Sequence, residues 1–143
     1  MNIALAIFKY FPHGGLQRDF MRIALELLRR GHKVTVFTRS FEGTVPEGMK
    51  VEFLKVSSLT NHGKAAEFGK LFNRKATGFD VRFAFNRIPD ADFYFAADNC
   101  IMSEALAVYP RWFLKVSPRH RAILEQEKSV MGEDKKTKIF YIV

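Results

Sequence analysis

The sequence has a single cysteine, Cys100, among its 143 residues, so no disulfide can form within the chain. It also lacks any apolar run near the roughly 20 residues that a membrane-spanning helix needs. The first apolar run, residues 3–8, is interrupted by Lys9 and a turn, which does not fit a secretory signal peptide. These absences lead us to expect a protein of a reducing, cytoplasmic environment.

The dinucleotide-binding fingerprint G-x-G-x-x-G is missing as well, which argues against a small NAD-type Rossmann enzyme. The four histidines, His13, His32, His62 and His120, are scattered and form no metal-ligand spacing with one another or with Cys100. Their order in the chain supports no Ser-His-Asp or Cys-His pairing either. We therefore expect neither a metal centre nor a nucleophilic triad.

Positive charge, in contrast, is abundant. The chain carries 23 lysines and arginines against 15 aspartates and glutamates, a formal net charge of +8. Such an excess implies attraction to an anion, and nucleic acid, an anionic membrane surface and a phosphorylated substrate all qualify. The length predicts one domain, and the 48% share of hydrophobic residues is enough to build a core.

The first 30 residues predict a strand, a glycine turn and an amphipathic helix. The strand covers Ile3 to Phe8, and the helix follows Gly14 and Gly15 and ends at Gly31. Glycines leave room for a ligand and permit unusual backbone conformations, and the free N–H groups of a helix start favour a phosphate. A turn that only connects the strand to the helix is about equally well supported, because Gly-Gly is a weak motif.

The remaining pattern alternates between strands and helices. Strands are expected at residues 33–38, 51–56, 80–85, 92–96 and 139–143, and helices from residue 64, over 101–109 and from 117, with a loop at 39–48. This order predicts an α/β fold, a Rossmann-like, mostly parallel sheet with helices on both faces. The last strand reads as a core strand with no helix after it, which favours a chain cut from a longer protein.

Four stretches carry a resemblance to a known family. They are KYFPHGGLQRDFMRIA at 9–24, TRSFEG at 38–43, TNHGKAAEF at 60–68 and FYFAADNC at 93–100. In this order they resemble the bacterial lipopolysaccharide core glucosyltransferases of retaining glycosyltransferase family 4, over nearly the whole chain. Members of that family have a GT-B fold, two Rossmann-like domains that face each other across a cleft. The resemblance implies that residues 1–143 are the N-terminal, acceptor-side domain and that the C-terminal nucleotide-sugar domain is absent.

The resemblance also implies a reaction. The full enzyme would transfer glucose from UDP-glucose to an inner-core heptose of lipopolysaccharide with retention, and this chain alone would be inactive. No metal or other cofactor is expected, because helix dipoles and basic side chains stabilise the leaving diphosphate in GT-B enzymes. The alternative is a stand-alone basic module for nucleic acid or another anionic partner. No RNA-binding motif appears, so we expect no nucleic acid as a partner.

Site residues follow from the resemblance. Gly14 and Gly15 would lie beside the donor diphosphate, and Asp19 would contact a hydroxyl of the transferred sugar. Asp98, at the end of a predicted strand, is the catalytic candidate, either as a ligand of sugar hydroxyls or against positive charge at the anomeric carbon. Two structural alternatives stay open, because Asp19 also complements the helix dipole and Asp98 can serve as a capping residue. His62, in the stretch TNHGK that matches the family, is a candidate for an acceptor-side role.

The stretch YPRWFLKVSPRHR at 109–121 is basic and aromatic, with no acidic residue. Aromatic rings favour the membrane interface, and lysine and arginine favour anionic headgroups. We expect peripheral attachment to the anionic cytoplasmic face of the inner membrane, which would bring the enzyme to its glycolipid acceptor. The alternative places the two large aromatics in the core. The membrane-binding candidates are Arg111, Trp112, Phe113, Lys115, Arg119 and Arg121.

Overall fold

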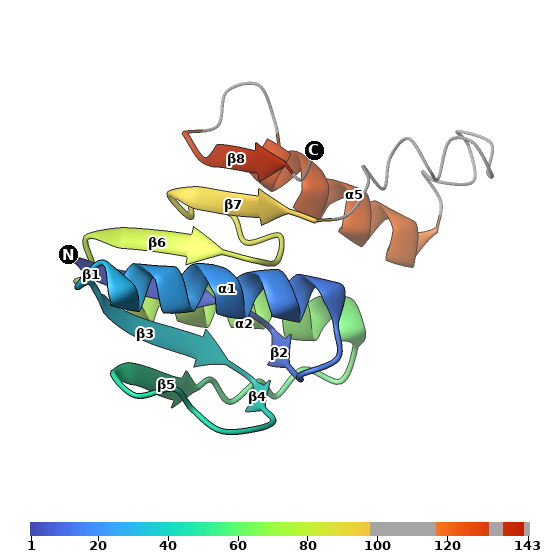
Figure 1. The fold of residues 1–143 in the computed structure, drawn as a ribbon. Coiled ribbons are helices and arrows are strands. Elements are labelled where there is room, and N and C mark those ends of the chain that lie inside the picture. The colour runs from blue at the N-terminus through green and yellow to red at the C-terminus, as the bar shows by residue number, and fades with distance from the viewer. Residues whose placement is uncertain (98–116, 132–135, 142–143) are drawn as a thin grey trace.

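The computed structural model describes residues 1–97, 117–131 and 136–141. Six parallel strands form one sheet in the order β5-β3-β1-β6-β7-β8, so that β1 lies inside the sheet (Figure 1). A parallel sheet needs crossover connections, and helices lie in those from β1 to β3 and from β5 to β6, whereas β6 and β7 are joined without a helix. The strands are β1 (Asn2–Ala6), β3 (Lys33–Thr38), β5 (Met49–Phe53), β6 (Val81–Ala84), β7 (Phe93–Ala96) and β8 (Lys138–Tyr141).

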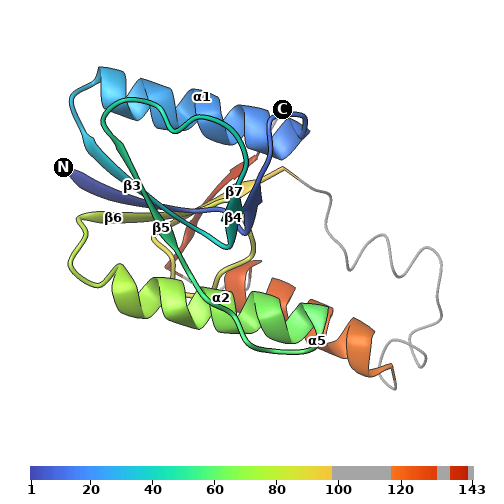
Figure 2. The ribbon, with the colours of Figure 1, turned by 90° about the horizontal axis from the view of Figure 1, so that it is seen from below.

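Helices cover both faces of the sheet. Helix α1 (Gly15–Arg29) lies on one face, and α2 (Asn61–Lys75) and α5 (Pro118–Met131) lie on the other (Figure 2). The predicted Rossmann-like α/β fold is therefore confirmed. In the part of the chain that the structure describes, no helix is long and apolar enough to cross a membrane.

Strand β1 is buried on both faces, as its continuous apolar run predicts. Ile3 and Leu5 belong to the core that includes Phe20 of α1, while Ala4 and Ala6 belong to the core beneath α2. The alternation follows from the two-residue period of a strand, which sends successive side chains to opposite faces. The first strand thus ties both layers of helices to the middle of the sheet.

The boundaries of α1 agree with the sequence prediction. Phe20 and Ala24 on its apolar side are fully buried. Gly31, with φ +82°, follows the helix in the left-handed conformation that suits glycine, and its N–H donates to the carbonyl of Leu28. The helix therefore runs its whole length along the sheet, with its N-terminus beyond the carboxyl ends of the strands (Figure 1).

A second, two-stranded sheet was not predicted. Strand β2 (Lys9–Tyr10) pairs in parallel with β4 (Ser40–Phe41), which occupies the start of the segment expected to be a loop at 39–48. The rings of Tyr10 and Phe41 stack with centroids 4.4 Å apart. Strands of two residues show no periodicity, so only the tertiary contact between these segments reveals them.

Other differences are smaller. Helix α2 begins at Asn61, three residues before the predicted start at Lys64, because the Thr60 side chain accepts the Gly63 N–H at 3.2 Å and caps the helix. The final strand is confirmed, and its reading as a core strand holds for one face: Ile139 packs against a buried cluster that includes Tyr94, whereas Phe140 is 49% exposed. Among the described residues, β8 is the last strand of the sheet. The helix expected at 101–109 lies outside the described residues.

Candidate functional site

The loops that follow β1, β3 and β6 meet at the carboxyl edge of the sheet, where ligands bind in open parallel sheets. The Arg39 N–H donates to the carbonyl of Phe8 at 3.0 Å, and the Phe8 N–H donates to Oδ1 of Asn86 at 2.6 Å. These bonds join three loops that lie far apart in the sequence. The carboxyl edge is therefore a fixed surface, and the β2–β4 pair extends it toward the start of α1 (Figure 1).

The glycine turn leads from β2 into α1 at this edge. Gly14 is the N-cap of α1, with no side-chain cap, and the first helical hydrogen bond runs from the Arg18 N–H to the Gly14 carbonyl at 2.9 Å. The N–H groups of residues 15–17 therefore have no partner within the helix. Together with the helix dipole, they provide donors suited to a phosphate or another anion.

The two glycines of the turn matter because they lack a side chain, and not because their backbone conformation is unusual. The expectation of an unusual backbone is wrong, because neither Gly14 nor Gly15 has a positive φ. A Cβ added to Gly14 would collide with the Gln17 side chain and lie 2.9 Å from Cε2 of Phe11, whereas one added to Gly15 would meet no atom within 4 Å. Gly14 is thus held by packing, and Gly15 faces open space that a ligand can enter.

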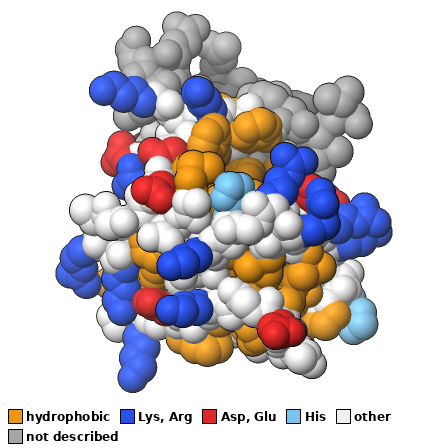
Figure 3. Space-filling model, turned by 60° about the vertical axis from the view of Figure 1, so that its left-hand side comes forward, with side chains coloured by type: hydrophobic (Ala, Val, Ile, Leu, Met, Phe, Trp, Pro, Cys, Tyr) orange, Lys and Arg blue, Asp and Glu red, His pale blue; other side chains and the backbone are white. Residues whose placement is uncertain are grey.

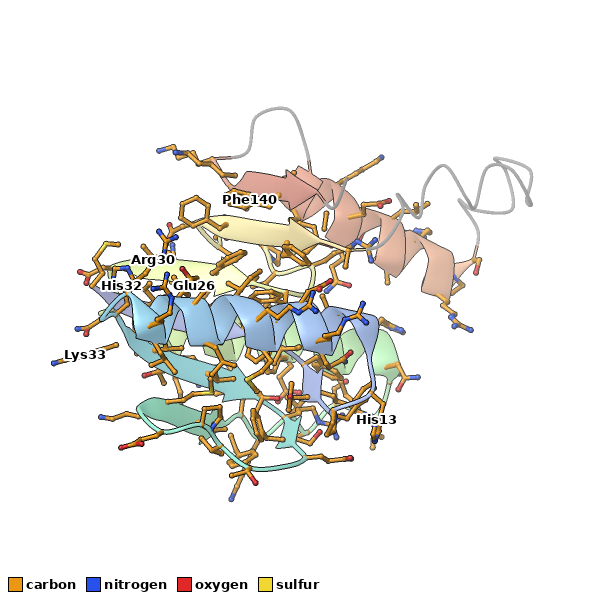
Figure 4. The ribbon with its side chains drawn as sticks, viewed as in Figure 1. His13, Glu26, Arg30, His32, Lys33 and Phe140 are labelled. Carbon is orange, nitrogen blue, oxygen red and sulfur yellow. The ribbon has the colours of Figure 1, made fainter. Side chains whose placement is uncertain are left out.

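Asp19 lies on α1, one turn after Gly15, and is half-buried. Within the described residues it makes no hydrogen bond or ion pair. That leaves its carboxylate available to a ligand, while its position near the helix start also complements the helix dipole. The contact with a sugar hydroxyl stays a prediction. His13, in the turn before the helix, is exposed (Figure 4).

Two of the predicted membrane-binding residues lie on α5. Arg119 and Arg121, near the start of α5, are exposed, as membrane contact requires. The remaining candidates lie outside the described residues, and they are Asp98, Arg111, Trp112, Phe113 and Lys115.

Two basic residues at the carboxyl edge, Arg39 and Arg87, are not among the predicted site residues. The guanidinium carbon of Arg39 lies 5.3 Å from the centroid of the Phe8 ring, and Phe8 in turn meets Phe68 edge-on, with centroids 5.3 Å apart. Arg87 pairs with Glu127 of α5, with 3.8 Å between Nη2 and Oε1. Their positions in the sequence could have indicated them, because each residue follows directly or closely on a predicted strand and so lies near the carboxyl edge.

The Arg87–Glu127 pair helps to attach α5 to this edge. Both side chains are largely buried, and Gln126 donates from Nε2 to the Arg87 carbonyl at 3.0 Å. A cavity of about 170 Å³ lies beside them, lined by residues of the β1 and β6 loops, α2 and α5. Because a buried charge pair is costly to break, we interpret it as a structural link between α5 and the site.

The loop before α2 is also held by a carboxylate. Glu67 accepts the N–H groups of Ser57 and Ser58, at 3.1 and 2.9 Å, and these bonds lower the pKa of its carboxyl group. His62, at the start of α2, is exposed and lines a groove between α2 and α5. An acceptor-side role for His62 stays a prediction.

No metal centre is formed by residues 1–97, 117–131 and 136–141, which contain no group of three His, Cys, Asp or Glu side chains suited to an ion. Asp90 and Asp92 lie two positions apart, but the Asp92 carboxylate accepts the Arg82 N–H at 2.8 Å and also pairs with the Arg82 side chain. Transfer without a metal stays a prediction.

No protein-family model matches this chain. The lipopolysaccharide glucosyltransferase WaaG of Escherichia coli (strain K12) is 38% identical over 144 residues, which cover 99% of this chain and 38% of that protein. A crystal structure of WaaG, described as a glycosyltransferase involved in lipopolysaccharide biosynthesis, matches with a TM-score of 0.89 at 37% identity, over 96% of this chain and 37% of its own.

A more distant structure, sucrose-phosphate synthase from Thermosynechococcus elongatus, matches with a TM-score of 0.55 at 14% identity, over 96% of this chain and 47% of its own. At that identity it supports the fold alone. The predicted resemblance to the lipopolysaccharide core glucosyltransferases is confirmed along nearly all of this chain. The chain spans 38% of the length of the curated relative that it matches.

Proposed function

We propose that this chain is the acceptor-side, Rossmann-like domain of a lipopolysaccharide glucosyltransferase with a GT-B fold. The complete enzyme would transfer glucose from UDP-glucose to an inner-core heptose with retention. The observation that carries this proposal is the 38% identity to WaaG over 99% of the chain, together with the TM-score of 0.89. A second, nucleotide-sugar domain would bind most of the donor.

The chemistry of the glycine turn supports this role. As the bond between glucose and the diphosphate breaks, negative charge grows on the leaving oxygens, and donors already in place stabilise it. The N–H groups at the start of α1 supply such donors, and the open space at Gly15 admits the phosphate. Asp19, one helical turn away, would contact a hydroxyl of the glucose. The reaction would need no metal.

A stand-alone module for nucleic acid has less support. Lysine and arginine side chains are dispersed over the face shown in Figure 3. A nucleic-acid-binding surface would instead have them clustered in a patch or stripe. Some of this charge is also offset: Glu26 accepts hydrogen bonds from Arg29 and Arg30, which lower its pKa to about 2, and its carboxylate balances one of the two positive charges. The positive charge therefore fits a surface of mixed charge with local anion sites.

Replacing Gly15 by valine should weaken donor binding without unfolding the protein. We expect UDP-glucose affinity to fall about tenfold in a chimera of this chain with the rest of WaaG, because the added branches occupy space that a phosphate needs. Isothermal titration calorimetry measures the affinity. Gly78→Val is the matched control, since a Cβ there also meets no atom within 4 Å but lies away from the site. Equal affinity of the folded Gly15→Val chimera and its parent would exclude the phosphate role.

Membrane attachment is the second part of the proposed function. We expect the chain to sediment with vesicles that contain anionic lipid, less with neutral vesicles, and less as salt screens the charges. Each basic residue near such a surface contributes about 1 kcal/mol, so replacing four by glutamine should abolish binding. The four are Arg111, Lys115, Arg119 and Arg121.

The control variant removes four exposed charges elsewhere, at Lys33, Lys50, Lys55 and Arg74. It changes the net charge equally and should keep most of the binding. If both quadruple variants lose binding to the same extent, the net charge binds the vesicle and the stretch 109–121 is not the anchor. Circular dichroism would verify that both variants are folded.

A further inference from the structure

Arg39 occupies a distinctive position at the carboxyl edge. It follows directly on β3, is half-buried, and places its guanidinium over the face of Phe8, the residue that links the loops after β1 and β6. An arginine stacked on an aromatic ring keeps its N–H groups at the rim of the guanidinium plane, where they can still donate.

The support beneath Arg39 is rigid. Its own N–H is bonded to the Phe8 carbonyl, and the Phe8 ring rests edge-on against Phe68, which is buried. Holding the side chain in one arrangement before a ligand arrives lowers the entropy lost on binding. Arg39 is therefore prepared to receive a ligand.

Arg39 has no acidic partner within the described residues. Other arginines of the chain do: Arg82 pairs with Asp92, and Arg87 pairs with Glu127. Among the residues that the structure describes, Arg39 contacts the Phe8 carbonyl through its backbone N–H and the Phe8 ring through its guanidinium. A half-buried positive charge without a counter-ion, at the edge where a parallel sheet binds ligands, is suited to an anionic group of a substrate.

We propose that Arg39 binds an anionic substituent, phosphate or carboxylate, on the lipopolysaccharide acceptor. The inference rests on the proposed function and adds a residue that selects the acceptor. The backbone N–H groups of the glycine turn are already suited to the diphosphate of UDP-glucose. We therefore assign Arg39 to the other substrate, the acceptor. The planar guanidinium matches either anion with two parallel hydrogen bonds.

The test is calorimetric binding of deacylated inner-core lipopolysaccharide to the 143-residue chain. The ligand is used untreated, dephosphorylated or with its carboxyl groups reduced. Arg39→Gln should weaken binding of the untreated form about tenfold, as expected for a lost charge-assisted pair. Arg39→Lys keeps the charge but loses the planar set of N–H donors, so its affinity should lie between those of the parent and Arg39→Gln. Lys33→Gln is the control, because Lys33 starts the same strand at the opposite end of the sheet (Figure 4).

The treated ligands identify the group that is bound. Removing the recognised anion should weaken binding to the parent and abolish its difference from Arg39→Gln. Equal binding of the untreated ligand by parent and folded Arg39→Gln would overturn the Arg39 inference and leave the proposed function standing. The same loss with all three ligand forms would also overturn it, since the charge would then act only at long range. A parent chain that binds no form would contradict both the inference and its acceptor-side role.

Discussion

Joined to the rest of WaaG, this chain should transfer glucose from UDP-glucose to the lipopolysaccharide core, whereas the 143 residues alone should transfer none. The chain spans 38% of WaaG, and we place most donor contacts in the part that it does not span. Enzymes gain much of their rate by holding two reactants together, with effective molarities that reach about 10⁵ M or more. Loss of one substrate site should therefore reduce the rate by at least that order.

The measurement is transfer of radiolabelled glucose to an acceptor lipopolysaccharide by the chain, by the remainder of WaaG alone, and by the chimera. Neither part alone should exceed the background. Transfer by the isolated chain at the rate of the chimera would show that the domain assignment is wrong. A folded chimera that binds UDP-glucose but transfers no sugar would contradict the acceptor-side role of this chain.

The largest effect on stability is expected from Phe20→Ala. The Phe20 ring is 0% exposed and lies 5.0 Å from the ring of Phe85 and 5.8 Å from that of Tyr10, measured between centroids. Truncation leaves a cavity between α1 and the sheet and should cost about 3–5 kcal/mol of the free energy of unfolding. Since Phe20 lies one turn beyond the first turn of α1, its loss should also loosen the glycine turn.

Urea denaturation followed by circular dichroism measures this cost. Leu25→Ala, on the exposed side of the same helix, is the control; Leu25 is 45% exposed and its truncation should cost under about 1 kcal/mol. Should Phe20→Ala fail to fold, Phe20→Leu offers a smaller truncation at the same site. A Phe20→Leu or Phe20→Ala variant no less stable than Leu25→Ala would contradict the packing of α1 described above.

Several elements could be predicted from neighbouring residues alone, because their signal is local. Strand β3 has the predicted bounds, Lys33–Thr38, and α1 follows the predicted glycine turn. Pro118 begins α5, as proline at a first helical position indicates. In these segments the hydrophobic period, the caps and the terminators agree with one another, so neighbouring residues suffice to specify the structure. The resemblance to the glucosyltransferases came from the same local stretches.

Features that depend on segments distant in the sequence could not be predicted and became visible in the folded chain. The β2–β4 pair exists because the chain returns beside Tyr10 some 30 residues later, and two-residue strands carry no period of their own. The open space at Gly15 depends on the elements that surround it. The same is true of Arg39, which has no acidic partner within the described residues. The place of a strand in the sheet also depends on which strands pair, and β8 is the last strand in the order that the described residues form. Local residues thus fixed the elements, and long-range packing fixed which side chains line the carboxyl edge.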